Sequence, residues 1–298
     1  LKVAGTQETI TTIGKNLNLG GIAGYVYGQI MAAGETLTNS GSIEVQNIDV
    51  TSDANIGGTF GRLNKATTVK SLVNYGSITL SNVKVAANVY LGGVVGQLSD
   101  MLTADSLTNS GAIEITNSAE IPGTVFMGGT IGNIGAAATV GALTNETTGT
   151  LKINNTTIKG KLNFGGIIGL ISVKSTLSNL HNKGAVTFDT ITVKGSYFNV
   201  GGIYSYNNGA DTALNNLTNE GSINISNTTI DSNTDVGGLI GTATNRTILK
   251  GKLENKGDIT CYNVTVTSDQ PAGIGGIVGL DYDLRETNTS KISDLYTT

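Results

Sequence analysis

The stretch GGTFGRLNKATTVKSLVNYGSITLSNVKVAANVYLGG, residues 57–93, contains one full copy of the unit that decides the fold. A Gly pair opens it, and the next Gly pair closes it. Between the two pairs lie a Leu-x-Asn motif ending at Asn74 and a segment in which apolar residues alternate with polar ones from Ile78. Such a unit is too short to fold alone, so further copies are expected along the chain.

Both markers recur along the whole sequence in one register. The Gly pairs are 35–38 residues apart, and they begin at Gly20, Gly57, Gly92, Gly128, Gly165, Gly201, Gly237 and Gly275. The Leu-x-Asn motif ends at Asn39, Asn74, Asn109, Asn145, Asn182, Asn219 and Asn255. Two independent markers with the same period indicate about eight copies of one repeat of about 36 residues.

Each repeat predicts three short strands, placed in one copy at 43–51, 55–63 and 69–74. Apolar residues two apart turn one face of a strand inward. The opposite face carries polar residues, at Glu44, Thr79, Glu114, Lys152, Thr187, Asn224 and Thr260. No window repeats apolar residues at helical spacing, and the abundance of β-branched residues also favours strands.

Stacked copies bury the inward faces that a single copy leaves open. The sequence therefore predicts an all-β protein, a right-handed parallel β-helix (β-solenoid) with one coil per repeat. The alternative is a left-handed β-helix with two 18-residue coils per repeat, but its tight hexapeptide pattern is absent. We expect one solenoid domain over 1–298, with a partial first coil at 1–30 and an irregular end or cap at 281–298.

Composition narrows the range of partners. Only 13% of the residues are charged, the net charge is −4 and the pI is near 5.0, whereas binding to nucleic acid requires a basic face. No apolar run has the length of a membrane span. A single cysteine excludes an internal disulfide and any site built from several cysteines.

The recurring Asn residues predict two ladders in which each amide bonds to the same residue of the next coil. The first comprises the seven Asn of the Leu-x-Asn motif. The second comprises Asn47, Asn82, Asn117, Asn155, Asn227 and Asn263, and Thr190 interrupts it. Both are interpreted as structural, since a buried amide must be satisfied.

The Gly pairs do not predict a nucleotide or metal site. No helix and no Lys-Ser/Thr follows them, and the Asp of the calcium-binding Gly-rich repeat is missing. We therefore expect no cofactor, no metal and no nucleotide. Gly instead supplies a positive φ here, or it lets the walls of the coil approach closely.

Catalytic constellations are not recognisable. His181 is the only histidine and is predicted to be a solvated wall residue, while Cys261 is predicted to point inward as a small hydrophobe. Glu44 and Glu114 share a wall position but lie two coils apart, near the limit for paired carboxylates. No Ser-His-Asp set or zinc motif is suggested.

One repeat departs from the pattern and supplies the candidate binding site. Its third Gly is replaced by Ser205, and three tyrosines gather around it. If the rings of Tyr204 and Tyr206 point outward, they form an aromatic platform; if they point inward, they fill the core. The candidate binding residues are Tyr197, Tyr204, Tyr206, Asn207, Asn208 and Asp211.

The motifs Gly275-Gly276-Ile277-Val278-Gly279 and Asn219-Glu220-Gly221-Ser222-Ile223 resemble the GLUG-type repeats of bacterial surface proteins. The likeness extends over nearly the whole chain. It implies an adhesin-like β-helix of Bacteroides-type bacteria, at the cell surface or secreted. The zinc peptidase that accompanies such repeats in some proteins has no counterpart in this sequence.

We therefore expect a non-catalytic binding or adhesion protein, a stalk or rod whose partner is an extracellular glycan or a host protein. The alternative is a polysaccharide hydrolase or lyase on the same scaffold, which requires two or three carboxylates, or a basic residue with a carboxylate, in one cleft. A third possibility is a purely structural spacer without a ligand.

Overall fold

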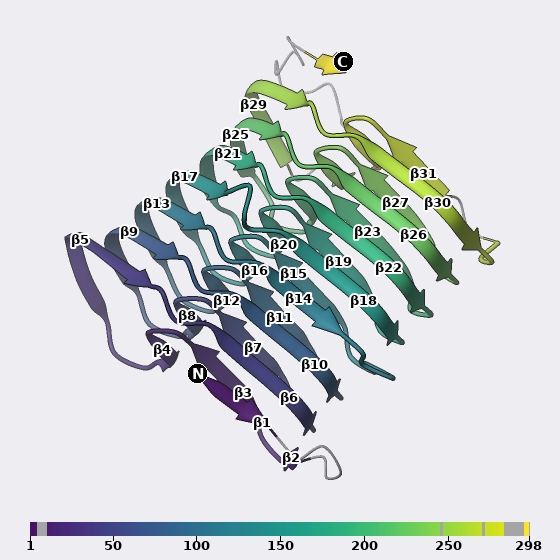
Figure 1. Cartoon of the computed structure of the whole chain (residues 1–298). Coiled ribbons are helices and arrows are strands. Elements are labelled where there is room, and N and C mark those ends of the chain that lie inside the picture. The colour runs from purple at the N-terminus through teal and green to yellow at the C-terminus, as the bar shows by residue number, and fades with distance from the viewer. Residues whose placement is uncertain (5–10, 245–246, 270–271, 283–294, 298) are drawn as a thin grey trace.

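The computed structural model describes residues 1–4, 11–244, 247–269, 272–282 and 295–297. It is an all-β parallel solenoid of about seven turns of about 36 residues, slightly fewer than the eight expected. Strands at the same position of successive turns lie side by side along the rod (Figure 1). Every pairing between them is parallel, as expected for coils that stack on one another.

Each turn contributes one strand to each of four sheets, which we name A to D in chain order. Sheet A contains β1 (Lys2–Ala4), β2 (Thr11–Ile13), β6 (Ile43–Val50), β10 (Ile78–Val85), β14 (Ile113–Thr116), β18 (Leu151–Ile158), β22 (Val186–Val193), β26 (Ile223–Ile230) and β30 (Ile259–Val266). Sheet B contains β3 (Leu17–Gly20), β7 (Ala54–Gly57), β11 (Val89–Gly92), β15 (Val125–Gly128), β19 (Leu162–Gly165), β23 (Tyr197–Gly201), β27 (Asn233–Gly237) and β31 (Ala272–Gly275).

Sheets C and D complete each turn. Sheet C contains β4 (Ala23–Val26), β8 (Phe60–Leu63), β12 (Val95–Leu98), β16 (Ile131–Ile134), β20 (Ile168–Ile171), β24 (Tyr204–Asn207), β28 (Ile240–Thr244) and β32 (Val278–Tyr282). Sheet D contains β5 (Ile30–Asn39), β9 (Thr67–Asn74), β13 (Leu102–Asn109), β17 (Ala138–Asn145), β21 (Thr176–Asn182), β25 (Thr212–Asn219), β29 (Thr247–Asn255) and β33 (Leu295–Thr297).

The prediction of three strands per repeat was wrong, because the expected strand at 55–63 is two strands. β7 ends at Gly57 and β8 begins at Phe60, so the Gly pair is a corner between sheets B and C. Of the predicted end region 281–298, Asp281 and Tyr282 close β32 and β33 pairs with β29, while 283–294 and 298 lie outside the described residues.

The apolar core has two lobes. Inward side chains of sheets A and B form one cluster, and those of sheets C and D form the other. Between the lobes, the second Gly of each of the first seven pairs faces the buried Asn column. A Cβ placed on Gly58 would lie 2.2 Å from Cγ of Asn74, and one on Gly93 would lie 2.3 Å from Cγ of Asn109. The two sequence markers are therefore one feature, because the glycine makes room for the asparagine.

The first Asn ladder is confirmed. Nδ2 of each residue donates to Oδ1 of the next, over six links of 2.8–2.9 Å from Asn39 to Asn255. The same amides also donate to backbone carbonyl groups a few residues later in the same coil, as Asn74 Nδ2 does to Gly76 O at 2.7 Å. The amides are buried but fully engaged, which removes the cost of burying them.

The second Asn column lies at the outer surface. Its members have a positive φ of 45–55°, and this region is readily adopted by Asn. Hydrogen bonds between the side-chain amides join Asn82 to Asn47, Asn155 to Asn117 and Asn263 to Asn227, at 2.8–2.9 Å. At the predicted interruption, Thr190 keeps the positive φ, and Asn227 bonds to Asp189 instead.

Positive φ is thus supplied by Asn and not by the Gly pairs. Gly251 is the one glycine with a positive φ among the described residues. Of the two explanations for the Gly pairs, close approach of the walls is the one that the backbone supports.

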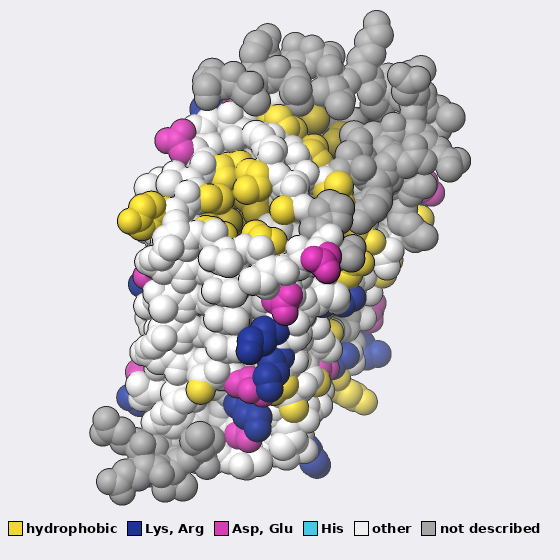
Figure 2. Space-filling model, turned by 90° about the vertical axis from the view of Figure 1, so that its right-hand side faces the viewer, with side chains coloured by type: hydrophobic (Ala, Val, Ile, Leu, Met, Phe, Trp, Pro, Cys, Tyr) yellow, Lys and Arg dark blue, Asp and Glu magenta, His cyan; other side chains and the backbone are white. Residues whose placement is uncertain are grey.

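The surface is poor in charge. Figure 2 shows one side of the rod, where Lys, Arg, Asp and Glu gather in a narrow row and most of the remaining area is uncharged. Several charges pair across neighbouring coils, such as Lys159 with Glu120 at 2.7 Å. Such exposed pairs contribute little to stability.

Candidate binding groove

Sheets B and C meet at the Gly pairs, and their outer faces form an angle that we call the B–C groove. One wall is the column of residues two before the first seven Gly pairs: Asn18, Asn55, Tyr90, Phe126, Asn163, Asn199 and Asp235. The other wall is the column five after the first Gly: Tyr25, Arg62, Gln97, Asn133, Leu170, Tyr206 and Thr242.

The groove hides polar side chains that a flat outer face would expose. The exposed fraction is 0% for Asn55, 5% for Asn163, 4% for Asn199 and 1% for Asp235. Since these residues alternate with core residues such as Ile56, they point away from the core. Their burial is therefore due to the opposite wall of the groove.

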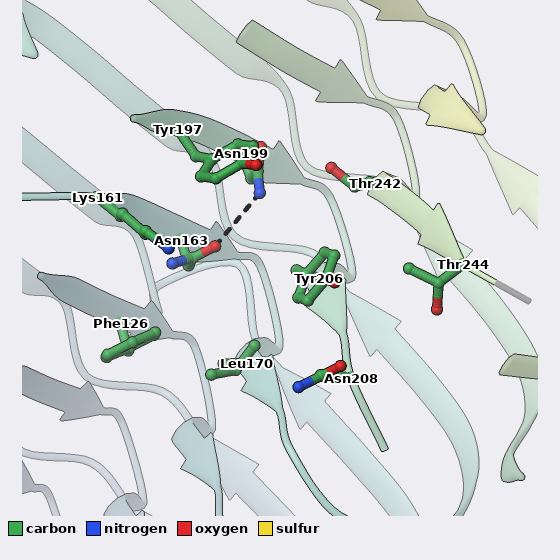
Figure 3. Close-up of a pocket in the computed structure, with 10 residues that line it drawn as sticks. All are labelled: Phe126, Lys161, Asn163, Leu170, Tyr197, Asn199, Tyr206, Asn208, Thr242 and Thr244. Atoms are coloured by element: carbon green, nitrogen blue, oxygen red, sulfur yellow. Dashed lines mark hydrogen bonds between the residues drawn. The ribbon is translucent and has the colours of Figure 1, made fainter. Parts of the chain in front are cut away.

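A pocket of about 570 Å³ lies in the groove over its C-terminal half. Figure 3 shows the side chains that line it, which come from sheets B and C of successive coils. They are Phe126, Lys161, Asn163, Leu170, Tyr197, Asn199, Tyr206, Asn208, Thr242 and Thr244. The volume is in the range of small-molecule sites, and the lining mixes aromatic rings with amides and hydroxyls.

Specific contacts order this lining. The ammonium of Lys161 lies over the ring of Tyr197, 5.1 Å from its centroid. Asn199 Nδ2 donates to Asn163 Oδ1 at 3.4 Å, the contact drawn in Figure 3. The sheet B wall is thus held in place before any ligand binds, which lowers the entropic cost of binding.

Asp235 lies just beyond the pocket lining, next to Asn199 in the same column. Its Oδ2 accepts from the Thr242 hydroxyl at 2.8 Å, across the groove. Oδ1 of Asp235 and Oδ1 of Asn199 are buried and have no hydrogen-bond partner among the described residues. Burial raises the pKa of the Asp235 carboxyl above its usual value, because desolvation disfavours the charged form.

The structure brings three of the six predicted site residues together. Tyr197, Tyr206 and Asn208 line the pocket. Asn207 instead points inward, where Nδ2 donates to Thr247 Oγ1 at 2.7 Å. Asp211 is exposed in the turn between β24 and β25, with a φ of 55°.

The expectation that Tyr204 and Tyr206 share a face was wrong. Tyr204 is fully buried in the lobe between sheets C and D, whereas Tyr206 is half-buried on the groove wall. Strict alternation fails next to the Gly-pair corner in every coil. In β8, for example, Phe60 and Leu63 are buried and Arg62 is on the outside. The four-residue strand therefore does not follow a period of two.

Ser205, which replaces the third Gly, lies where sheets B and C approach most closely. Its hydroxyl bonds to the carbonyl oxygen of Gly169 in the preceding coil. A Cβ placed on Gly241, one coil further, would lie 3.0 Å from Val200 N. A Cβ placed on Gly96, at the same position of an earlier coil, would lie only 2.6 Å from Ile56 N. The backbones of the two sheets are thus a few tenths of an ångström farther apart beside the pocket.

Sequence reasoning missed most of the pocket. Lys161 has no repeated counterpart, and Asn stands at only four of the seven positions in the column of Asn163 and Asn199, which is a weaker signal than the unbroken Asn ladder. The positions of Asn163 and Asn199 did carry a signal, because each residue stands two before a Gly pair. Counting from the Gly pairs would have placed both on one outer column.

The remaining candidate residues do not form a second site. Glu44 pairs with Lys2 at 3.0 Å and Glu114 with Lys152 at 3.4 Å, so the two carboxylates have separate partners. The exposed fraction of the His181 side chain is 32%, and its Nε2 is 3.4 Å from Glu220.

Cys261 is in register with inward-pointing Ile225, as predicted, yet its side chain is exposed. The reason is that β30 is the last strand of sheet A in the described part of the chain. Within the described ranges, no three His, Cys, Asp or Glu residues are grouped as metal ligands. The same residues contain no helix long and apolar enough to cross a membrane.

The fold and the pocket define the class: a parallel β-solenoid with a ligand-sized groove on its outer face. Compared with known proteins, the chain matches no family model, no curated protein and no solved structure. The lining of the B–C groove is therefore the feature from which a function can be proposed.

Proposed function

We propose that this protein is a non-catalytic binding rod that holds a glycan in the B–C groove. One observation carries the proposal: the pocket combines aromatic rings with amides and hydroxyls, and none of its ten described lining residues bears a carboxylate. Aromatic faces pack on the apolar faces of sugar rings, while amides and hydroxyls bond to sugar hydroxyls.

The same lining favours binding over hydrolysis. Glycoside hydrolysis uses two carboxyl groups on either side of the scissile bond. Asp235 is a carboxylate next to the lining, but it is tied to Thr242 and has no acidic partner in its column. A lyase remains the rival, since Lys161 and Tyr197 could neutralise and deprotonate an acidic sugar.

The proposed location is a bacterial cell surface or the extracellular space. It is supported by the resemblance of the Gly-rich motifs to GLUG-type repeats and by the low share of charged residues. An adhesin-like role follows, in which stacked coils present the groove at a distance from the surface. A host-protein partner is the other outcome that the experiment below separates.

A glycan array tests the proposal. The intact protein should bind a subset of glycans, and the double variant Tyr197→Ala, Tyr206→Ala should lose that binding. Tyr75→Ala is the matched control, because the exposed fraction of Tyr75 is 59% and it lies outside the groove. Full retention by the double variant, or cleavage of the bound glycan into unsaturated products, would contradict the proposal.

A further inference from the structure

The B–C groove continues beyond the pocket toward the N-terminal coils. Phe126, which lines the pocket, stacks on Tyr90 of the preceding coil, with centroids 5.2 Å apart and an interplanar angle of 7°. The two rings stack on each other along the rod axis and form one continuous apolar column. The apolar wall of the pocket therefore extends one coil beyond it as a longer track.

The track has buried polar atoms on both walls. Oδ1 of Asn55 and Oε1 of Gln97 have no hydrogen-bond partner among the described residues. Asn55 is fully buried although it points away from the core. The groove thus remains deep at this level, one to two coils before Phe126.

All four unpaired groove atoms are acceptors. On the sheet B wall of the groove, side-chain amide nitrogens donate between coils: Asn55 Nδ2 donates to Asn18 Oδ1 at 3.0 Å, and Asn199 Nδ2 donates to Asn163 Oδ1. The side-chain oxygens of Asn55 and Asn199 have no donor among the described residues. A matching ligand must offer many donors along its length together with apolar C–H surface, and this is the chemistry of a chain of sugar rings.

The charges in the groove do not require an acidic ligand. Arg62 Nε donates to Ser99 Oγ at 3.1 Å, and its guanidinium lies 5.9 Å from the ring centroid of Tyr25. Lys161 lies over Tyr197. Both cations are engaged within the protein, and buried Asp235 would repel an anion.

Peptides fit this track less well. An extended peptide is recognised at the edge of a sheet, where free backbone groups pair with it. The walls of the B–C groove are the faces of sheets B and C, whose strands are already paired on both sides. The groove therefore offers side chains only.

We infer that the B–C groove binds a neutral, unbranched polysaccharide that lies along the rod axis, from the level of Asn55 to that of Asp235. This inference rests on the proposed function and specifies its ligand. Asn55, Tyr90, Phe126, Asn163, Asn199 and Asp235 are on six successive coils. With coils about 4.8 Å apart, the track is about 24 Å long, enough for several sugar rings.

Chain length is the variable that tests the inference. The probes are neutral linear glucans, mannans and xylans, each from disaccharide to long oligosaccharide, measured by calorimetry on the intact protein. Affinity should rise with length until the track is filled. Tyr90→Ala should weaken binding of the long chains about three- to tenfold and leave the shortest binding chains unchanged.

Tyr206→Ala should weaken binding at every length, and Tyr75→Ala at none. If Tyr90→Ala does not fold, Gln97→Ala makes the same test on the opposite wall. If affinity does not depend on chain length and neither Tyr90→Ala nor Gln97→Ala weakens binding, the extended track is overturned, but the pocket proposal stays intact. Preference for an acidic polymer overturns the neutral ligand, and no binding to any glycan overturns both proposals.

Discussion

Two columns of asparagine run the length of the rod and use the same side chain for different purposes. In the buried column of Asn39 to Asn255, the amide fills the gap between the two core lobes and bonds to the backbone around it. In the surface column of Asn47 to Asn263, the backbone conformation is the essential feature, since every member has a positive φ. A repeated residue therefore marks either a side-chain or a backbone requirement.

The largest effect should come from the glycine that faces the buried column. A Cβ on Gly93 would lie 2.1 Å from Gly129 O and 2.3 Å from Asn109 Cγ, so Gly93→Ala must displace the ladder. We expect a loss of about 3 kcal/mol or more in the free energy of unfolding. Urea denaturation measures it, with Gly34→Ala as control, because a Cβ on Gly34 meets nothing within 4 Å.

Removal of a buried amide should have the next largest effect. Asn109→Ala leaves Asn74 Nδ2 and Asn145 Oδ1 without their partner. The expected cost is about 1–3 kcal/mol, the penalty for a buried polar group left unpaired. Asn109→Gly should be no better, since its backbone does not have a positive φ. An unchanged denaturation midpoint for Asn109→Ala would contradict a stabilising ladder.

The surface column should respond differently to the same pair of substitutions. Asn82 has a φ of 50°, so Asn82→Ala should cost about 1 kcal/mol, mainly through backbone strain. Asn82→Gly should be close to neutral, because Gly adopts this region without penalty. Equal losses in thermal denaturation for the two variants would show that the amide, and not the backbone, matters here.

The smallest effect concerns the groove, where Asn199 meets Asp235. Burial raises the pKa of Asp235 in the folded protein, so its ionisation at neutral pH opposes folding. Asp235→Asn should therefore stabilise the protein at pH 7. The gain should disappear as the pH falls below the ordinary carboxyl pKa of about 4, where both states are protonated.

Unfolding measured over this pH range tests the sign of that effect. A variant less stable at pH 7 than the parent protein would show that the carboxylate of Asp235 is stabilised in the groove.

The parts of the structure that were predictable are those that repeat. Ile78 and Leu80 recur coil after coil because every coil must fill the same core, and this spacing gave the solenoid and its inward faces. The buried ladder was predictable for the same reason. The fourth strand was missed, because a corner of two glycines inside a run of strand-forming residues resembles a continuous strand.

The groove could not be found in this way. The column of Tyr90, Phe126, Asn163 and Asp235 mixes aromatic rings, an amide and an acid, so no single chemistry marks it. Their convergence depends on the angle between sheets B and C, which close packing of glycine against backbone sets. The substitution at Ser205 did point to the correct coil, but it could not tell which tyrosine faces outward.

The hydrogen bonds between side-chain amides also align the amide dipoles along the rod axis. Along the buried column each Nδ2 donates toward the C-terminal neighbour, as Asn74 does to Asn109. In the surface column the donation runs toward the N-terminus, as from Asn82 to Asn47, and in the groove from Asn55 to Asn18. The side-chain dipoles of the inner and outer columns therefore oppose one another. A helix sums its peptide dipoles, whereas this rod can lengthen coil by coil with its amide dipoles largely cancelled.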